Sequence, residues 1–360
     1  MSTDKADHRA GSSGTVSGTV SGTDRERECS QRTGRELILA TNEFAHDDAL
    51  TSWRHLGLTV VLLLTTMYGT LSDLHLAGRF ICSVLSALLL VRLFVIYHDF
   101  QHRAILLNSK LAEGVMSLCG MVCLAPPSIW RSSHFYHHRH NSKIRTAWIG
   151  SFPIMTCQAY ADSTSGARRR YRMARHPIVM LIGYVPIFLI GMCLMPALRD
   201  SRQHADCWIA LVLHFCLLLT TWLIAGWSGL LLGGLLPFFG ASMVGSYLFY
   251  AQHNFPEVVL HGKENWSYEL AALGSSSHLV MGRCMRWFTA NIGYHHVHHL
   301  NSRIPFYRLP EAVRAIPELQ SPRVTSLRPL EILRCLRLKL WDEDLGRMVP
   351  IERVDFPAAP

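Results

Sequence analysis

Histidine is the residue whose placement in this sequence could support chemistry. The chain has 20 histidines, and ten of them fall into three short groups. The groups are HDFQH with His98 and His102, HFYHHRH with His134, His137, His138 and His140, and HHVHH with His295, His296, His298 and His299. A further histidine, His253, stands alone in AQHNF. Neutral imidazole is a common ligand of iron, copper, zinc and nickel, so the groups predict a metal site.

The spacing inside each group is that of one helical face. His98 and His102 are four residues apart, and the other two groups repeat a spacing of three and four residues, which makes neighbours on a helix. Eight side chains have this spacing, and the lone His253 makes nine candidate ligands, which is more than one ion can bind, so we predict two metal ions. Solvated or ordinary buried histidines would explain one such group, but not three with the same spacing. His140 and His296 do not share the spacing, and we expect them to support the ligands from behind.

The identity of the metal follows only in part from the residues. The sequence contains no HExxH motif, so the general base of a zinc protease is missing from its usual place. It contains no CxxC pair that would favour zinc. An all-imidazole site for two metals beside a membrane suits iron and the activation of O₂, although ligand chemistry alone leaves copper and zinc open.

The composition indicates which kind of molecule must position these groups. Of the 360 residues, 49% are hydrophobic and only 17% are charged. The apolar residues occur in long uncharged runs, which predicts an integral membrane protein and excludes a disordered or fibrous chain. The ten cysteines are scattered singly, so we interpret them as reduced thiols rather than a disulfide framework.

Five apolar runs are candidates for the membrane-embedded helices. They span residues 56–72, 80–97, 111–129, 178–198 and 207–252. The first two are joined by a short link and should form a hairpin, and 207–252 is long enough for two crossings that turn near residues 226–229. The run 111–129 is short and ends in two prolines, which favours an interfacial or re-entrant segment. The run 178–198 is interrupted by glycine and proline, and we expect that it does not span.

The charges predict the orientation of the chain in the membrane. The net charge is +9, and many arginines and lysines lie between residues 103 and 175. By the positive-inside rule this region is cytoplasmic. The basic residues are not interleaved with aromatic residues as in RNA-binding motifs, so nucleic acid is not an expected partner.

The two ends of the chain differ from its middle. Residues 1–35 are polar and contain the repeat SGTVSGTVSGT, so we predict a disordered N-terminal tail. We assign residues 50–320 to one membrane domain and residues 321–360 to a cytosolic C-terminal tail.

The order of the three groups carries a resemblance. HDxxH, HxxHH and HxxHH beside paired apolar hairpins resemble the membrane fatty acid desaturase family over roughly residues 50–320. RWFTANIGYHHVHHLNSRIPFYRLPE (286–311) and FYAQHNF (249–255) are especially similar to the bacterial acyl-lipid branch, of the Δ12/ω6 kind. Phe100 and Gln101 stand where small residues are common in that branch, which predicts altered access to the metals or altered regiochemistry.

The resemblance implies a fold, a cofactor and a reaction. The fold is an all-α integral membrane protein with about four transmembrane helices in two hairpins plus interfacial or re-entrant segments, capped by a cytosolic helical di-iron domain. Two iron ions and O₂ would insert a cis double bond into an acyl chain of a membrane lipid, with electrons from an external donor such as ferredoxin or a cytochrome b5-like protein. The implied iron ligands are His98, His102, His134, His137, His138, His253, His295, His298 and His299.

Other residues and partners are implied less directly. Asn291, four residues before His295, could orient a ligand or a bound water, or cap a helix, and His140 and His296 could support the ligands. The catalytic groups would lie on the cytoplasmic side of the bacterial inner membrane, where the basic stretch from Arg168 to Arg175 could dock an acidic donor or lipid headgroups. Four aromatic residues could line an acyl tunnel or form an interfacial belt, namely Tyr97, Trp130, Tyr136 and Trp287.

Two other functions fit parts of the sequence. Relatives with the same histidine groups hydroxylate or ketolate acyl chains and lipids. A metal transporter is a more distant alternative, because transport sites lie near the middle of the bilayer. Here the histidine groups fall at the ends of the apolar runs and in arginine-rich segments.

Overall fold

A computed structural model of the chain describes residues 32–144, 150–262 and 264–353. The chain divides into Met1–Arg32 and a compact unit, Thr33–Pro360, and the description below concerns that unit. The predicted N-terminal tail lies outside the described residues except at its end. There Gly34 and Arg35 already belong to helix α1 (Gly34–Thr41), so the predicted end of the tail at residue 35 is slightly too late.

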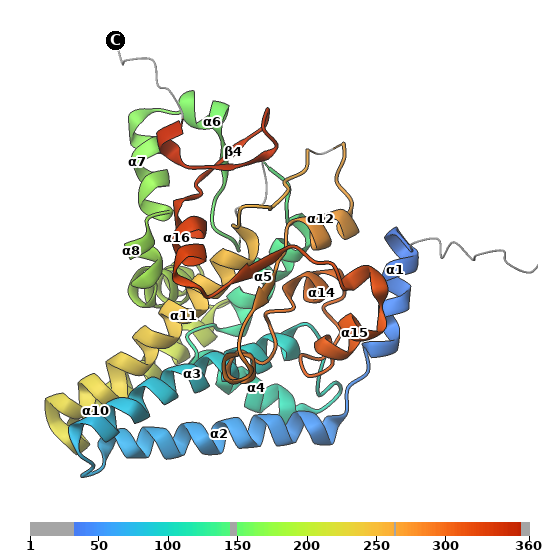
Figure 1. Ribbon diagram of the computed structural model, residues 1–360. Helices are drawn as coiled ribbons and strands as arrows, with labels where there is room; N and C mark the ends of the chain where they lie inside the picture. The colour runs from blue at the N-terminus through green and yellow to red at the C-terminus, as the bar shows by residue number, and fades with distance from the viewer. Residues whose placement is uncertain (1–31, 145–149, 263, 354–360) are drawn as a thin grey trace, which may run out of the picture. The chain divides into compact units, whose positions relative to one another are not determined.

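Two helical hairpins carry most of the apolar sequence. Helices α2 (Ala49–Leu71) and α3 (Leu76–Gln101) pack along each other, with α2 beneath α3 in Figure 1. The second hairpin comprises α10 (Ala205–Gly229), the π-helix η3 (Leu230–Leu235) and α11 (Leu236–His253).

The second hairpin reverses inside α10. Gly226 has φ +59° and ψ −151°, a backbone conformation that is almost restricted to glycine. After this turn the chain folds back, so that a Cβ added at Gly234 would meet Leu218 and Thr221. The turn falls where the sequence predicts it.

The number of membrane crossings depends on how the helical segments are grouped. By length and composition two described helical segments could cross a membrane, Leu76–Gln101 and the reversing segment Ala205–His253. A third exists if α4 (Lys110–Val122) and α5 (Pro127–His140), which are bent by 86°, count as one span. The predicted arrangement of four crossings in two hairpins therefore stays a prediction.

The run 178–198 forms irregular helix rather than one long helix. It contains α8 (Pro177–Leu181), the π-helix η2 (Tyr184–Leu194) and α9 (Met195–Arg199). The continuous apolar part, Tyr184–Arg199, is shorter than the ~20 residues that a helix needs to cross a bilayer. That the run does not cross the membrane stays a prediction.

The polar parts of the chain form short helices and strands around the hairpins. The further helical elements are η1 (Asn42–Phe44), α6 (Cys157–Ala161), α7 (Ser165–Ala174), α12 (Tyr268–Gly274), α13 (Arg283–Phe288), α14 (His295–Leu300), α15 (Leu309–Ala315), η4 (Pro317–Leu319), α16 (Pro329–Arg337) and η5 (Ile351–Arg353). The strands are β1 (Met155–Thr156), β2 (His278–Val280), β3 (Val324–Ser326), β4 (Leu340–Asp342) and β5 (Arg347–Val349).

The strands correct the expectation of a purely helical fold. They form a three-stranded sheet in the order β1-β4-β5 and a two-stranded sheet of β2 and β3. Strand β1 pairs with β4 in parallel and β4 pairs with β5 antiparallel, while β2 and β3 are parallel. Each sheet ties the C-terminal segment to an earlier part of the chain.

The C-terminal segment is folded onto the rest of the unit over its described part. Cys335 and Trp341 are buried in one core cluster with Tyr250 of α11. Arg175 is also fully buried, and its guanidinium donates hydrogen bonds to the Leu338 carbonyl and the Tyr250 hydroxyl. The sequence interpretation of residues 321–360 as a tail misses this packing.

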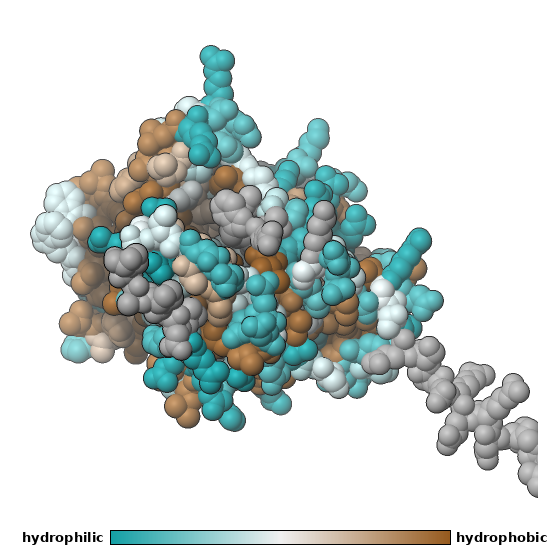
Figure 2. All heavy atoms as spheres, turned by 90° about the horizontal axis from the view of Figure 1, so that it is seen from above, coloured by the Kyte–Doolittle hydropathy of each residue, from teal (hydrophilic) through white to brown (hydrophobic). Residues whose placement is uncertain are grey.

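Exposed hydrophobic side chains cover the outer faces of the hairpins. They include Leu64 of α2, Phe80 of α3, and Phe215 and Leu223 of α10. In Figure 2 the hydrophobic residues gather toward the side on which α10 lies, whereas hydrophilic residues dominate the opposite side. Large contiguous apolar surfaces are unusual in soluble monomers and are expected where lipid surrounds the protein.

Candidate metal centre

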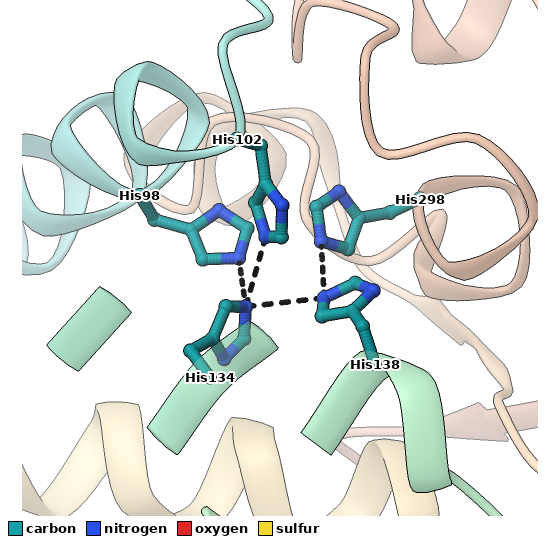
Figure 3. A group of neighbouring side chains, drawn as sticks. All are labelled: His98, His102, His134, His138 and His298. Carbon is teal, nitrogen blue, oxygen red and sulfur yellow. Dashed lines mark hydrogen bonds between the residues drawn. The ribbon is translucent and has the colours of Figure 1, made fainter. Parts of the chain in front are cut away.

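Five histidines from three helices form the first group, which we call the first histidine cluster. It consists of His98, His102, His134, His138 and His298, whose ligand atoms all lie within 4.8 Å of one another (Figure 3). The Nε2 atom of His134 lies 2.9 Å from Nε2 of His98, 2.9 Å from Nε2 of His102 and 3.1 Å from Nε2 of His138. His298 completes the group, with its Nε2 3.3 Å from that of His138.

Four more histidines form the second histidine cluster. The ligand atoms of His137, His253 and His299 lie within 4.8 Å of one another. His295 joins them, because its Nε2 is 2.9 Å from Nε2 of His253 and 3.1 Å from Nε2 of His299. The two clusters are adjacent, since the rings of His138 and His299 are stacked with centroids 4.1 Å apart. The eight histidines with helical spacing and the lone His253 are therefore brought together.

The contacts between the rings fit a bound cation. Nε2 of His134 contacts three other Nε2 atoms, yet one nitrogen of a neutral imidazole has either a single N–H or a single lone pair, so these contacts cannot all be hydrogen bonds. Lone pairs that converge in this way repel each other unless a cation lies between them. Nitrogen ligands that share one ion lie only a few ångströms from each other, as these Nε2 atoms do. The clusters therefore fit metal binding.

The environment keeps the rings in the form that binds metal. Burial, and secondarily the neighbouring histidines, hold the pKa of His298 and His299 well below the usual value of histidine. These rings are consequently neutral near pH 7 and offer a lone pair. A metal ligand must be deprotonated in this sense before it can bind.

Asp99 holds one of the ligands in place. Its side chain is fully buried, and its Oδ1 lies 3.2 Å from Nδ1 of His98. Its Oδ2 accepts the backbone N–H of Phe306 at 2.7 Å. A carboxylate behind a ligating histidine fixes the ring's orientation and tautomer. This role of Asp99 was not predicted from the sequence, although an acidic residue directly after the first histidine of HDFQH could have indicated it.

Asn291 holds the segment that contacts Asp99. Its side-chain amide donates to the carbonyl of Phe306 at 3.1 Å, on the same residue whose N–H binds Asp99. This hydrogen bond fixes the segment that holds Asp99, and a role of Asn291 in orienting a ligand or a bound water stays a prediction.

His140 and His296 lie outside both clusters. Nδ1 of His140 is 2.9 Å from the carbonyl of Tyr136, and the two rings are stacked. His296 is fully buried, with its Nε2 3.4 Å from the carbonyl of Leu319, and burial lowers its pKa to about 3. The predicted role of these two residues in supporting the ligands from behind stays a prediction.

A separate polar group holds the start of α5. The Ser128 hydroxyl donates to Oδ1 of Asp206 at 2.6 Å and lies 2.8 Å from Nδ1 of His204. The Ser128 backbone N–H donates to the other oxygen of Asp206 at 2.8 Å. His204 and Asp206, with Cys207, have ligand atoms close enough to hold a metal. Their hydrogen bonds to Ser128 give them a structural role at the beginning of the helix that carries His134, His137 and His138.

An apolar cavity adjoins the first histidine cluster. It has a volume of about 480 Å³, and its walls include Phe94 of α3, Trp130 and His134 of α5, and Phe249 of α11. The indole of Trp130 is stacked on the His134 ring with centroids 4.7 Å apart. We call this space the acyl cavity, after the chain that the resemblance to desaturases predicts it to hold.

The residues that line this cavity can be compared with those predicted to line an acyl tunnel. Among the four aromatic candidates only Trp130 lines the acyl cavity. Tyr97 donates its hydroxyl to the Ala125 carbonyl, and Trp287 lies under Arg92. Phe100 and Gln101 do not line the cavity either, and Gln101 instead accepts a hydrogen bond from Arg131.

Comparison with known proteins decides the family. The model of the fatty acid desaturase family matches residues 74–329, which is most of the chain. The chain belongs to this family. It is accordingly a fatty acyl desaturase, an oxidoreductase that acts on fatty acyl chains, and its histidine clusters support an iron-type cofactor. The family, together with the apolar helices, makes it a membrane protein.

Individual relatives of the desaturase come from bacteria and plants. A fatty acid desaturase of Bacillus subtilis is 29% identical, over 89% of this chain and 87% of its own length. An sn-1 oleoyl-lipid 12-desaturase of Picosynechococcus is 23% identical, over 62% of this chain and 65% of its own. A chloroplastic sn-2 acyl-lipid omega-3 desaturase (ferredoxin) of Arabidopsis thaliana is 28% identical, over 70% and 65%. The chain thus spans slightly less than two thirds of the latter two relatives.

Proposed function

We propose that this chain is a di-iron acyl-lipid desaturase that inserts a cis double bond into an acyl chain of a membrane lipid. One observation carries the proposal: His134 belongs to the first histidine cluster and also forms part of the wall of the acyl cavity. A methylene group in that cavity would lie beside the metal centre. A metal site without an adjoining apolar space would not account for an acyl substrate.

The nine clustered histidines are the proposed ligands. The first histidine cluster would hold one iron ion and the second would hold the other. When bound, the irons supply the O₂ chemistry for the reaction, in which two adjacent methylenes, O₂, two electrons and two protons give a double bond and two waters. The chain's own groups keep the ligands neutral and oriented, as Asp99 does for His98.

The acyl cavity would provide position and dryness. A saturated chain has no polar group that distinguishes one methylene from the next, so only the shape of the cavity can select a pair. Phe94 and Phe249 supply apolar walls, and Trp130 covers one face of the His134 ring. Packed aromatic groups exclude water from the reacting methylenes.

The proposed substrate is lipid-linked. Helices α3 and α11, which contribute walls of the cavity, belong to the two segments that are long and apolar enough to cross a membrane. An acyl chain could therefore enter from the surrounding lipid. The relative from Picosynechococcus is described as acting on an oleoyl-lipid, which supports the same carrier for this chain.

The proposed electron donor is an acidic soluble protein on the cytoplasmic side. Arg169 and Arg170 of α7 are exposed, and they belong to the basic region that the positive-inside rule assigns to the cytoplasm. The Arabidopsis relative has ferredoxin in its description, which supports a carrier of that kind. Arg175, at the end of the predicted docking stretch, is buried and so does not contribute to this surface.

Expression in a bacterium that makes monounsaturated but no polyunsaturated lipids tests the proposal. We expect new diunsaturated acyl chains in the membrane lipids, with the bond located by mass spectrometry, and none in cells that express His298→Ala. Lipids that stay unchanged while the wild-type protein is iron-loaded and supplied with ferredoxin would overturn the proposal. Hydroxylated chains in place of new double bonds would overturn it as well.

A further inference from the structure

A second cavity lies on the other side of α3 from the acyl cavity. It has a volume of about 280 Å³, and three arginines line it, namely Arg92, Arg283 and Arg286, together with His55. Leu90, Val91 and Phe94 face the acyl cavity, whereas Arg92 faces the second one. At 100° per residue these positions fall on opposite faces of the helix. We call this space the arginine cavity.

Arg92 is a buried cation without an anionic partner. Its side chain is only 2% exposed. Its Nε donates to the Thr59 hydroxyl at 3.0 Å, one terminal nitrogen contacts Nδ1 of His55 at 3.1 Å, and the other donates to the Trp287 carbonyl. Among the described residues no carboxylate forms an ion pair with it. Burying a charge with only neutral partners is costly, so an anion in the adjoining cavity would lower that cost.

Two arginines of α13 add positive charge around this cavity. Arg283 is exposed and Arg286 is half-buried, and none of the lining residues is acidic. Tyr307, also in the lining, donates its hydroxyl to Asp47, whose other oxygen accepts the N–H of Leu106. That carboxylate is therefore already engaged. Three planar guanidinium groups around one cavity suit the oxygens of a phosphate group better than a halide or a single carboxylate.

The lining of the arginine cavity is typical of a membrane interface. Arg92 is six residues before His98 on α3, which is about 9 Å along the helix from the metal centre. The wall also includes Trp287 and Tyr307, and such residues concentrate where a membrane meets water. His55 comes from α2, so one wall of the cavity is the first membrane hairpin itself.

We propose that the arginine cavity binds the phosphate of an anionic phospholipid headgroup. This lipid is distinct from the one whose acyl chain is desaturated, because the two cavities lie on opposite faces of α3. The bound phosphate joins α3 to α13, which precedes the third histidine group. The inference does not depend on the proposed reaction, since it concerns binding alone.

Lipid binding to the purified, iron-loaded, full-length protein tests the proposal. Native mass spectrometry with added phosphatidylglycerol should show one tightly held lipid per chain, and phosphatidylcholine should bind more weakly. Arg283→Gln combined with Arg286→Gln should reduce the affinity for phosphatidylglycerol about 25-fold, at about fivefold for each arginine near a membrane surface. Iron content equal to that of the wild type shows that the double variant is folded.

A matched control variant and a second ligand define the results that would overturn the proposal. Arg303 and Arg328 are exposed and do not line the cavity, so Arg303→Gln with Arg328→Gln removes the same charge and should leave binding unchanged. Equal weakening by both double variants would overturn the proposal, because it would show a general effect of charge. Inorganic phosphate that binds with the same dependence on Arg283 and Arg286, while phosphatidylglycerol does not, would overturn the assignment to a lipid.

Discussion

At the scale of single residues, the direction of a ring nitrogen separates the proposed ligands from their neighbours. His295 and His296 are adjacent in sequence, yet a helix turns by about 100° per residue, so their rings diverge. His295 faces His253 and His299, while His296 faces the carbonyl of Leu319. Helical spacing was therefore sufficient to predict eight of the nine histidines that meet, whereas the lone His253 came from the resemblance to the family.

Asp99 gives a prediction about metal affinity. Asp99→Asn keeps an oxygen that can accept the Phe306 N–H but removes the negative charge next to Nδ1 of His98. Loss of such a supporting carboxylate should lower the affinity for iron by about 10- to 100-fold. Competition with a chelator of known affinity measures this. Asp162→Asn, at an exposed acid that accepts from Gln158, is the control and should have no effect. Equal affinities in all three proteins would mean that Asp99 does not support the site.

At the scale of elements, the acyl cavity depends on a small residue of α11. Gly245 lines the cavity, and a Cβ added there would meet nothing within 4 Å. A larger side chain at this position would therefore occupy the cavity without forcing the backbone to move.

Gly245→Leu should separate the cavity from the metal centre. We expect at least about a tenfold loss of desaturated product with unchanged iron content, because the substrate's place is filled while the ligands are untouched. Gly57→Leu on α2 is the matched control, since Gly57 is exposed and equally open. Product formed by Gly245→Leu at the wild-type rate and position would show that acyl chains bind elsewhere.

The elements also show which parts of the fold could be predicted from sequence patterns. The hairpins and the turn near Gly226 were predictable, because long apolar runs and glycine carry local signals. The strands were not, because β1 has two residues and pairs with a segment near residue 340. So short a strand has no periodicity, and its partner is distant in the chain. The burial of Arg175 in an arginine-rich stretch was hidden for the same reason, since its partners include Leu338.

At the scale of the whole molecule, deletions at the N-terminus can test where the folded unit begins. Residues 1–31 are polar, whereas α1 is anchored by buried Leu37 and by a hydrogen bond from the Gly34 N–H to Glu269. Deleting residues 1–31 should leave activity in membranes within about twofold of the full chain. Deleting residues 1–44 also removes buried Phe44 and should lower the amount of folded protein. Loss of turnover in the shorter deletion, with normal iron content, would give the removed segment a catalytic or docking role.

The exposed charge of α7 gives a prediction about the donor. Arg169→Glu with Arg170→Glu should raise the KM for ferredoxin about tenfold at low salt, and the difference should shrink as ionic strength rises. Arg199→Glu with Arg202→Glu reverses two exposed charges elsewhere and serves as the control. Steady-state kinetics with the donor titrated measures the effect. An unchanged KM in the α7 variant would exclude this helix as the docking surface.

The most direct test of the account is the iron content of eleven single His→Ala variants, measured by elemental analysis alongside product formation. We predict about two irons per chain in the wild type, and loss of iron and activity at each of the nine clustered positions, because an opened coordination site loosens the metal. His140→Ala and His296→Ala should keep about two irons and measurable activity, with losses of no more than about 10- to 100-fold. If His296→Ala empties the site while His295→Ala or His298→Ala retains both irons, the proposed ligand set is contradicted.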